Sequence, residues 1–413
     1  MSAGAALAAI DPTTIVVTGN GVKTVSYTLS GSNPEIVTFE VHTNGVLASG
    51  AAKFAVGDVF RKLEPGAHSF VWRAEKALPE QVYATGDFAI KLKTWPLNCP
   101  PDYMILDAHD KTARYYRFET DLPRPVTDTV YTASGVVPFR KISVGLQRHV
   151  RKISTTEYPT VVTEDFYFSV FPVTEGHLSW LQGETSCNSL PKSNSWTGWR
   201  GSNLAYPTKG GVVSNITEWT GIAFDLPTEA QWELAARAGD FEHDLTSGET
   251  LDTAAYTEVD RQLKSGNKVR HYPQLDDIAW YAGNMPVDAN GAFVVPRVGL
   301  KKPNRWGIYD LLGLFWEVCR DCWPGRNTCP DYSTAGVYDP CAPAQTFAEG
   351  GFGSGWYAYR GGACNLADGS YCTLARRDGC RPTYSNDRYT ACDVGGNAAR
   401  LGARLVCPAK AVW

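Results

Sequence analysis

Hydrophobic and polar residues alternate along short segments between residues 13 and 93 of the 413-residue chain. The pattern occurs in segments 14–18, 24–29, 36–41, 68–72 and 88–92, with turn residues between them. Alternation predicts strands with one buried face. Short strands at this spacing are typical of an antiparallel sandwich. We therefore predict an all-β, immunoglobulin-like sandwich over residues 1–93.

The pattern changes after residue 93. Residues 94–134 contain five prolines and few periodic positions, which predicts a connector. From residue 135 onward, isolated helix signals lie within long irregular stretches. We therefore expect a second globular domain over residues 135–413, joined to the sandwich by this Pro-containing connector.

The clearest helix signal covers residues 228–237. Thr228 and Gln231 have the spacing of a capping box, and Gly239 follows as a stop signal. A second helix is predicted over residues 174–181. Helices are therefore expected to be few in this domain.

The composition excludes several classes of function. Hydrophobic residues make up 43% of the chain and charged residues 20%, and the net charge is -4 without a basic block, which argues against a nucleic-acid partner. No run approaches the roughly 18 apolar residues of a membrane span, and the N-terminus lacks the basic region of a signal peptide. We expect a chain without a membrane span that is cytoplasmic, or carried on a phage virion or a cell surface through partners.

Cysteine chemistry stays open at this point. The chain has 11 Cys, seven of them after residue 325. Reduced thiols are favoured because no secretion signal is visible, and a disulfide framework is the alternative. The spacing Cys319-x-x-Cys322, with Cys329 and Cys341 beyond it, suggests zinc, but no second close pair or nearby His completes a tetrahedral set.

Several segments, taken in order, resemble a known family. They are 165–168 with 171–174, 224–233 with 235–237, and 304–313 with Trp316-Glu317, followed by Arg360-Gly361-Gly362 and Gly402-Ala403-Arg404. Their order resembles the formylglycine-generating enzyme family, or sulfatase-modifying factor domain, over about residues 135–407. The resemblance implies a C-type-lectin-like (formylglycine-generating-enzyme-like) fold for this domain. With the sandwich predicted before it, we expect an α+β chain. We assign scaffold roles to the large aromatic residues, close-approach glycines and framing arginines of that domain: Trp232, Trp316, Arg360, Gly361, Gly362, Arg376, Gly402 and Arg404.

The catalytic equipment of the family does not carry over. In the enzymes of this family, a Gly-Gly pair is followed by two Cys five residues apart that hold copper(I), a soft ion suited to thiolates. Counted from Gly361-Gly362, these positions are Leu366 and Tyr371 here. Cys372 lies one position beyond the second, and Cys364 precedes it by eight residues. We predict no catalytic residues, with a copper-dependent oxidase that uses Cys372 and a displaced partner as the alternative.

The metal sites that the resemblance implies are also incomplete. The family often binds calcium near a Gly-Asn-Val-Trp-Glu segment, where this chain has Leu314 in place of Asn. Asn284 is a candidate for part of another such site. A further branch of the family uses His ligands for iron, but the seven His of this chain are scattered, and we interpret His177 as a helix-surface or core-edge residue. We therefore predict no metal site and no cofactor, with calcium left open.

Residues 363–400, called the tail segment below, follow neither helical nor strand periodicity. They are rich in Asn, Asp, Ser, Gly, Tyr, Cys, Arg, Thr and Ala, which are residues reachable from Asn codons by changes at adenines. With the framing motifs, this layout resembles the variable proteins of diversity-generating retroelements, with a variable region over about 360–406. Our candidate ligand contacts are the polar, charged and aromatic residues of this segment: Asn365, Asp368, Ser370, Tyr371, Arg377, Asp378, Arg381, Tyr384, Asn386, Asp387, Arg388 and Tyr389.

These observations lead to one function hypothesis and its rivals. We predict a non-enzymatic, receptor-like variable protein that recognises a protein or surface ligand of unknown identity through a diversified C-terminal face. Tyr and Arg on a fixed backbone give contact area at low entropic cost, and short polar residues adapt their hydrogen bonds. The copper-dependent formylglycine-generating oxidase acting on a sulfatase Cys is the alternative. A lectin with a fixed ligand is a third possibility.

Overall fold

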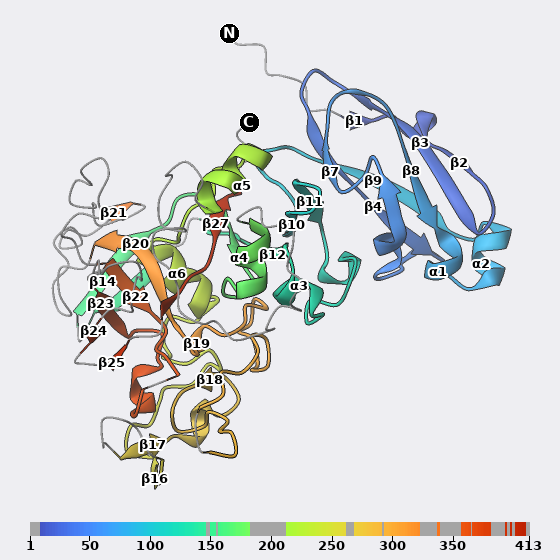
Figure 1. Cartoon of the computed structure of the whole chain (residues 1–413). Helices are drawn as coiled ribbons and strands as arrows, with labels where there is room; N and C mark the ends of the chain where they lie inside the picture. Colours follow the sequence, from blue (N-terminus) through green and yellow to red (C-terminus); the bar gives the residue numbers. More distant parts are fainter. Residues whose placement is uncertain are drawn as a thin grey trace. The chain divides into compact units, whose positions relative to one another are not determined.

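The computed structural model (Figure 1) describes residues 9–145, 149–153, 156–181, 212–261, 268–290, 293–322, 337–338, 357–364, 366–380, 393–394, 397–398 and 401–409. The chain forms two compact units, one of Met1–Asp128 with Ala409–Trp413 and one of Thr129–Pro408. Within the described ranges, none of the helices has the length and apolar character needed to cross a membrane.

Two antiparallel sheets build most of the first unit. One sheet contains β1 (Ala9–Ile10), β3 (Val22–Ser30), β8 (Gly66–Arg73) and β6 (Ala55–Gly57) in that order, and β2 (Val16–Thr18) pairs with β3. The other contains β5 (Val46–Leu47), β4 (Glu35–Thr43) and β7 (Arg61–Leu63), and β9 (Ala89–Trp95) pairs with β4. Short helices complete this part of the unit: η1 (Pro12–Thr14), η2 (Ala51–Phe54), α1 (Ala74–Ala77) and α2 (Glu80–Thr85).

The predicted strand alternation is confirmed in β3. Its residues Val25, Tyr27 and Leu29 are buried, while the residues between them are more exposed. Aromatic rings from both sheets meet in the core, with Phe39 of β4 4.8 Å from Phe70 of β8 between ring centroids. The first unit is therefore a sandwich of two sheets. Its immunoglobulin-like topology stays a prediction.

The stretch predicted as a connector contains a hairpin. Strands β10 (Tyr103–Asp107) and β11 (Thr112–Tyr116) pair in antiparallel register, and η3 (Glu119–Asp121) follows. The backbone N–H of Tyr115 donates to the Phe60 carbonyl over 2.7 Å, and Tyr116 stacks on Phe60 with ring centroids 4.7 Å apart. The interior of β10 is buried on both faces, so its sequence lacks the alternation by which a strand is recognised.

The second unit has more irregular structure. Its helices are α3 (Val130–Ala133), α4 (Glu175–Leu181), α5 (Val212–Thr220), α6 (Glu229–Arg237), η4 (Pro273–Leu275) and η5 (Gly369–Tyr371). Its strands are β12 (Val136–Ile142), β13 (His149–Ile153), β14 (Thr156–Val161), β15 (Phe166–Ser169), β16 (Thr257–Val259), β17 (Val269–His271), β18 (Ala279–Trp280), β19 (Leu312–Gly313), β20 (Trp316–Cys322), β21 (Val337–Tyr338), β22 (Tyr357–Arg360), β23 (Arg377–Cys380), β24 (Asp393–Val394), β25 (Asn397–Ala398), β26 (Leu401–Gly402) and β27 (Val406–Pro408).

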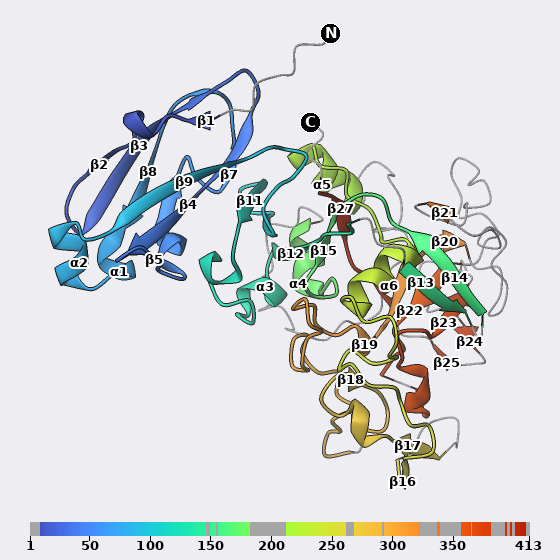
Figure 2. The same ribbon diagram turned by 180° about the vertical axis from the view of Figure 1, so that it is seen from behind.

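The sheet that matters for the tail segment has the order β23-β22-β20-β26. Strand β22 lies between β20 and β23 in antiparallel pairing, and β26 runs parallel to β20. Both ends of the tail segment are therefore next to strands of the same sheet. Figure 2 shows this sheet beside α6 from behind.

Both predicted helices are confirmed. Thr228 caps α6 through its hydroxyl, and Gln231 completes the capping box by accepting from the Thr228 N–H. Thr174 caps α4 in the same way, because its hydroxyl accepts from the backbone N–H of His177. His177 differs from the prediction, since it is fully buried and its Nε2 lies 2.8 Å from the Tyr131 carbonyl.

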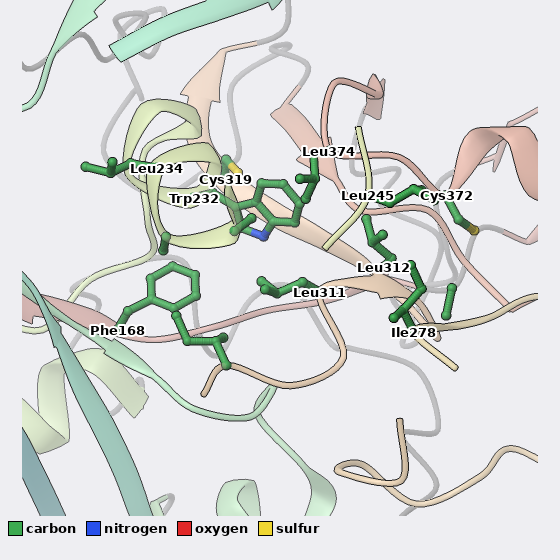
Figure 3. Packing of buried hydrophobic residues seen from close by; sticks show 14 of the residues in the cluster. Phe168, Trp232, Leu234, Leu245, Ile278, Leu311, Leu312, Cys319, Cys372 and Leu374 are labelled. Atoms are coloured by element: carbon green, nitrogen blue, oxygen red, sulfur yellow. The ribbon is translucent and has the colours of Figure 1, made fainter. Parts of the chain in front are cut away.

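Helix α6 is packed into the main core of this unit. Trp232 is fully buried, and its indole ring lies near Leu311 and Leu374 (Figure 3). Phe168 from β15 and Cys319 from β20 belong to the same hydrophobic cluster. The core thus connects α6, the sheet of order β23-β22-β20-β26 and residues Cys372 and Leu374 of the tail segment.

Candidate functional site

Two glycines lie between the end of β22 and the start of the tail segment. Gly361 and Gly362 both have positive φ, at 90° and 87°. A Cβ on Gly361 would lie 2.5 Å from the Leu311 carbonyl oxygen, and one on Gly362 would lie 2.7 Å from the Sγ of Cys372. Only glycine fits this combination of left-handed backbone and close approach. The glycine pair therefore fixes the direction in which the tail segment leaves the sheet.

Arg360, just before these glycines, is fully buried. Its guanidinium lies 2.7 Å from a Glu233 oxygen and 3.2 Å from a Glu229 oxygen, both on α6. It also donates to the Leu374 carbonyl over 2.7 Å and lies over the Trp232 ring. One side chain thus ties the start of the tail segment to α6 and to a turn within the segment.

Arg377 is the clearest correction to the predicted contacts. Its side chain is only 3% exposed, and its Nε donates to Glu229 over 2.6 Å. The physical reason is register, because Arg377 pairs with Arg360 across β23 and β22 and opposite residues of an antiparallel pair point to the same face. Asp378 is also largely buried and lies 3.2 Å from Arg376. Neither Arg377 nor Asp378 is displayed as predicted.

The far end of the segment is held by Arg404. This residue is fully buried, and its Nε lies 2.7 and 2.8 Å from the two carboxylate oxygens of Glu317. Trp232 donates to the same carboxylate over 2.5 Å. Burial raises the pKa of Glu317, and the Arg404 charge limits that rise. Both ends of the tail segment therefore depend on buried ion pairs.

Together, the buried arginine and glutamate side chains around α6 and β20 form what we call the buried ion network. It includes Arg237, whose Nε donates to Glu233 over 2.8 Å. Asp321 supports it from β20, because its carboxylate accepts from the Glu229 N–H over 2.7 Å at the start of α6. The network consists of Glu229, Glu233, Glu317, Arg237, Arg360, Arg377 and Arg404.

Asp368 organises the part of the tail segment that faces solvent. Its carboxylate accepts from Tyr272 over 3.0 Å and from the Ser370 N–H over 2.9 Å, and it pairs with Arg270 over 2.9 Å. Burial acts to raise the pKa of Asp368, but these hydrogen bonds and the Arg270 charge lower it overall. Its oxygens are thus already used in holding the turn that includes η5.

Residues far away in sequence take part in this surface. Arg270 of β17 lies over the ring of Tyr256, 4.6 Å from the centroid, and its backbone N–H donates to the Ala367 carbonyl. The Arg270–Asp368 pair spans 98 positions, so no local spacing reveals it. Tyr256, Arg270 and Tyr272 are the residues that sequence reasoning missed.

The remaining predicted residues fall into three groups. Ser370 and Tyr371 are partly exposed, and Arg376 of the predicted scaffold lies over the Tyr371 ring with its side chain also partly exposed. Trp316 and Gly402 are buried, with Trp316 packed on Tyr359 at 4.6 Å between centroids. Seven predicted contacts lie outside the described residues: Asn365, Arg381, Tyr384, Asn386, Asp387, Arg388 and Tyr389.

The thiols of this region do not match the copper site of the resembled enzymes. Leu366 and Tyr371 occupy the expected Cys positions, while Cys364 and Cys372 are both buried. Burial raises the pKa of Cys372, and the nearby Cys364 raises it further. Two buried thiols at another spacing than the family's Cys pair, one of them with a raised pKa, do not fit the thiolate pair that copper(I) needs.

Calcium does not fit the segment around Leu314 either. Leu314 is buried and supplies no side-chain oxygen, and the nearby Glu317 carboxylate is already paired with Arg404. At Asn284, the side-chain oxygen accepts from the Tyr281 N–H over 3.1 Å and the amide donates to the Ala279 carbonyl over 2.9 Å. The Asn284 side chain thus serves a turn. Across the parts of the chain that the structure describes, no group of three or more His, Cys, Asp or Glu could hold a metal ion.

Comparison with known proteins now defines the class. Residues 119–406 match the family described as "Sulfatase-modifying factor enzyme 1-like domain". This is more than half of the chain, so the protein belongs to that family. The resemblance inferred from the motifs is confirmed at this level.

Individual relatives are more distant. A "Formylglycine-generating enzyme" of Thermomonospora curvata is 33% identical over 101 residues, which cover 24% of this chain and 27% of that protein. The chain thus matches about a quarter of that relative. Among solved structures, PvdO from Pseudomonas aeruginosa has 15% identity and a TM-score of 0.38, covering 66% of this chain and 95% of its own. CarF has 16% identity and a TM-score of 0.31, covering 75% and 98%.

Proposed function

We propose that this chain is a non-enzymatic binding protein that presents its tail segment as a recognition surface. The observation that carries the proposal is the burial of both framing arginines, Arg360 and Arg404, in ion pairs with Glu side chains of α6 and β20. Such pairs fix both ends of a segment while the side chains between them can differ. Ser370 and Tyr371 lie at that surface and are partly exposed.

A fixed backbone with interchangeable side chains suits a diversified protein. We propose, on the tail composition and its framing motifs, that the chain is a variable protein of a diversity-generating retroelement. The proposal includes a C-type-lectin-like fold for the second unit and an immunoglobulin-like sandwich for the first. Its ligand is a protein or surface component that the rigid aromatic and adaptable polar side chains contact.

The neighbouring DNA gives a direct test. We expect a near-repeat of the DNA for residues 360–406 beside a reverse-transcriptase gene, with differences confined to adenines of that repeat. A locus without such a repeat, or a repeat whose differences fall at all four bases, would refute the retroelement assignment. The binding role is tested separately, by comparing the stability of variants at the partly exposed Ser370 and Tyr371 with that of a variant at the buried Arg377.

One observation favours a second candidate, a copper-dependent formylglycine-generating oxidase. Of the tail-segment side chains that the structure describes, Cys364 lies close enough to Cys372 to act on its thiol electrostatically, so Cys364 is the candidate for the displaced partner of Cys372. The test is aldehyde formation from a Cys-x-Pro-x-Arg peptide with copper(I). The oxidase requires product from the wild type, loss in Cys372→Ser and retention in Cys407→Ser, a buried control on β27. No product from the wild type would exclude it.

A further inference from the structure

Strand β9 forms an edge of the sheet that also contains β4, β5 and β7. It pairs with β4 along its whole length. On its other side, no strand pairs with β9 among the residues that the structure describes. Strand β1 lies near β9 but pairs with β3. An unpaired strand edge of this length is a template for another extended chain.

Backbone hydrogen bonds show which groups of β4 face β9. In an antiparallel ladder, the N–H and C=O of one residue point to the same side, and successive residues alternate. The Val37 carbonyl accepts from the Phe60 N–H over 2.7 Å, and the Val41 carbonyl accepts from the Ala48 N–H over 2.8 Å. Both contacts lie on the side of β4 that faces β7 and β5. Glu40, one position before Val41, therefore directs its backbone groups toward β9.

The same alternation identifies the free groups of β9. Lys91 lies opposite Glu40 in register, so the backbone groups of Lys91 point toward β4. Those of its two neighbours, Ile90 and Leu92, point away from β4, and no turn or loop hydrogen bond uses them within the described part of the chain. The open edge thus offers N–H donors and C=O acceptors at two alternate residues, as an added antiparallel strand requires.

The side chains of Ile90 and Leu92 lie at the margin of the sandwich core. Ile90 is opposite Val41, and Leu92 is opposite Phe39. Opposite residues of an antiparallel pair share a face. Val41 and Phe39 are each 1% exposed, whereas Ile90 and Leu92 are partly exposed. An added strand with apolar side chains at alternate positions covers both residues and extends the core by one strand.

The opposite face of β9 carries lysines. Lys91 is exposed, and the side chain of Lys93 is 39% exposed. Glu40, opposite Lys91 in register, is shared by Lys93, Arg117 and His42. Lys91 itself has no ion-pair partner among the described residues. An added strand therefore meets an excess of positive charge on this face.

We propose that the β9 edge binds an extended segment of another protein in which apolar and acidic residues alternate. The free backbone groups select an extended chain. Ile90 and Leu92 select apolar side chains on one face of that chain, and the lysines select acidic side chains on the other. A second copy of β9 does not fit, because it would place lysines beside lysines. This surface is separate from the tail segment and from the function proposed for it.

Fluorescence anisotropy of a labelled synthetic peptide, Val-Glu-Val-Glu-Val-Glu-Val, titrated with the full chain tests the proposal. We expect the peptide to bind the wild type. Leu92→Pro removes an N–H that faces the open edge and keeps the ladder with β4, since proline is tolerated where the N–H of an edge strand faces outward. We expect this variant to bind about tenfold more weakly, because a peptide carbonyl loses its donor.

N-methylated peptides test the same backbone contact from the peptide side. Val side chains that pack on Ile90 and Leu92 belong to residues whose N–H groups face β9. N-methylation of the Val amides is therefore expected to abolish binding, whereas N-methylation of the Glu amides, which face away from β9, should leave it unchanged. This comparison also decides the question should Leu92→Pro fail to fold as judged by circular dichroism.

The charge preference has its own pair of variants. Lys91→Glu is expected to weaken binding of the Val and Glu peptide about fivefold, because like charges then lie on neighbouring strands. Lys76→Glu is the matched control, since Lys76 is exposed on α1, outside both sheets. It should bind the peptide like the wild type.

Four results overturn the proposal. They are no binding of the unmodified peptide to the wild type, equal binding of a peptide with Lys in place of Glu, equal binding after N-methylation of the Val amides, and equal losses in Lys91→Glu and Lys76→Glu. The first would leave the edge without a partner of this chemistry, and the second would remove the acidic preference. The third would show contact through side chains alone, and the fourth would show attraction by the net charge of the unit.

Discussion

At the scale of single residues, the buried ion network is the feature that most constrains the second unit. Arg360 alone contacts two carboxylates, a carbonyl and an indole ring. A buried pair contributes little compared with well-packed apolar residues, because desolvation offsets the attraction. Removing one partner is different, since a buried carboxylate then loses part or all of its compensating charge. Without Arg404, Glu317 loses its arginine partner, and without Arg360, Glu229 and Glu233 each keep one arginine instead of two. Each arginine of the network is therefore expected to be intolerant of single substitution.

Arg360→Met tests this directly. We expect the free energy of unfolding to fall by about 3–5 kcal/mol, because Glu229 and Glu233 lose a shared buried partner. Urea unfolding followed by tryptophan fluorescence measures the change. Arg320→Met is the control, since Arg320 is 60% exposed in its pair with Asp225 and should change stability by less than about 1 kcal/mol. If both variants lowered the free energy of unfolding equally, burial of the Arg360 ion pairs would not explain their contribution to stability.

His177 predicts a pH dependence. Burial lowers its pKa to about 4, and its Nδ1 accepts from the Thr174 N–H, which a protonated ring would lose. The folded pKa lies below the unfolded value of about 6.5, so this group favours the fold above pH 6.5. That advantage, about 3 kcal/mol, is lost as pH falls toward 4.

The measurement compares the wild type with His177→Gln across this pH window. We expect the difference in unfolding free energy to be largest above pH 6.5 and to shrink toward pH 4. Burial raises the pKa of Asp310 to about 6, so the contribution of Asp310 to stability grows as pH falls, opposite to that of His177. Comparing the wild type with His177→Gln at each pH cancels the contribution of Asp310, because both proteins contain it. A difference that does not change with pH would show that His177 has only a packing role.

At the scale of elements, what the sequence revealed depended on whether the signal was local. The cap of α6 was visible because Thr228 and Gln231 are three positions apart, and the alternation in β3 was visible because one of its faces is buried. Strand β10 was missed because both of its faces are buried in its interior. Arg377 was misplaced because residue type suggests display, whereas pairing with Arg360 across two strands turns it inward.

The contact between η5 and β17 leads to a prediction at this scale. Asp368→Asn keeps the shape of the side chain but removes the charge that faces Arg270. Charged hydrogen bonds are stronger than neutral ones by about 1 kcal/mol, so we expect the Ser370 and Arg270 amides to exchange about fivefold faster. Hydrogen exchange with mass spectrometry reports this for the two peptides.

Asp252→Asn serves as the matched control, because Asp252 also accepts from a backbone N–H two residues ahead but is exposed. Its substitution should leave the Ser370 and Arg270 amides unchanged. Faster exchange confined to Ser370, with Arg270 unaffected, would show that Asp368 shapes only its own turn. It would not then connect the tail segment to β17.

At the scale of the whole molecule, the proposed function places stability and recognition in different residues of the second unit. The buried ion network and the glycine pair hold the ends of the tail segment, while Ser370 and Tyr371 between them are partly exposed. The family match covers the frame and this segment alike. Separation of this kind is what allows a surface to change while the fold persists.

A pair of variants tests that separation. The double variant Ser370→Tyr with Tyr371→Ser exchanges two partly exposed residues and removes the contact of Arg376 with the Tyr371 ring. We expect it to lower the free energy of unfolding by no more than about 1 kcal/mol. Arg377→Ser also changes a residue of the tail segment, but it removes one of the two buried arginine partners of Glu229. We therefore expect it to lower the free energy of unfolding by about 3–5 kcal/mol.

Urea unfolding of both variants against the wild type measures the two losses. If the exchange at Ser370 and Tyr371 costs as much as Arg377→Ser, the segment is a packed element throughout and cannot serve as an interchangeable surface. If Arg377→Ser is as mild as the exchange, the buried ion network does not hold the segment, and the proposed binding role loses its structural basis. Only a large difference between the two variants, in the stated direction, supports a surface whose displayed residues vary while register and burial keep the residues beneath them constant.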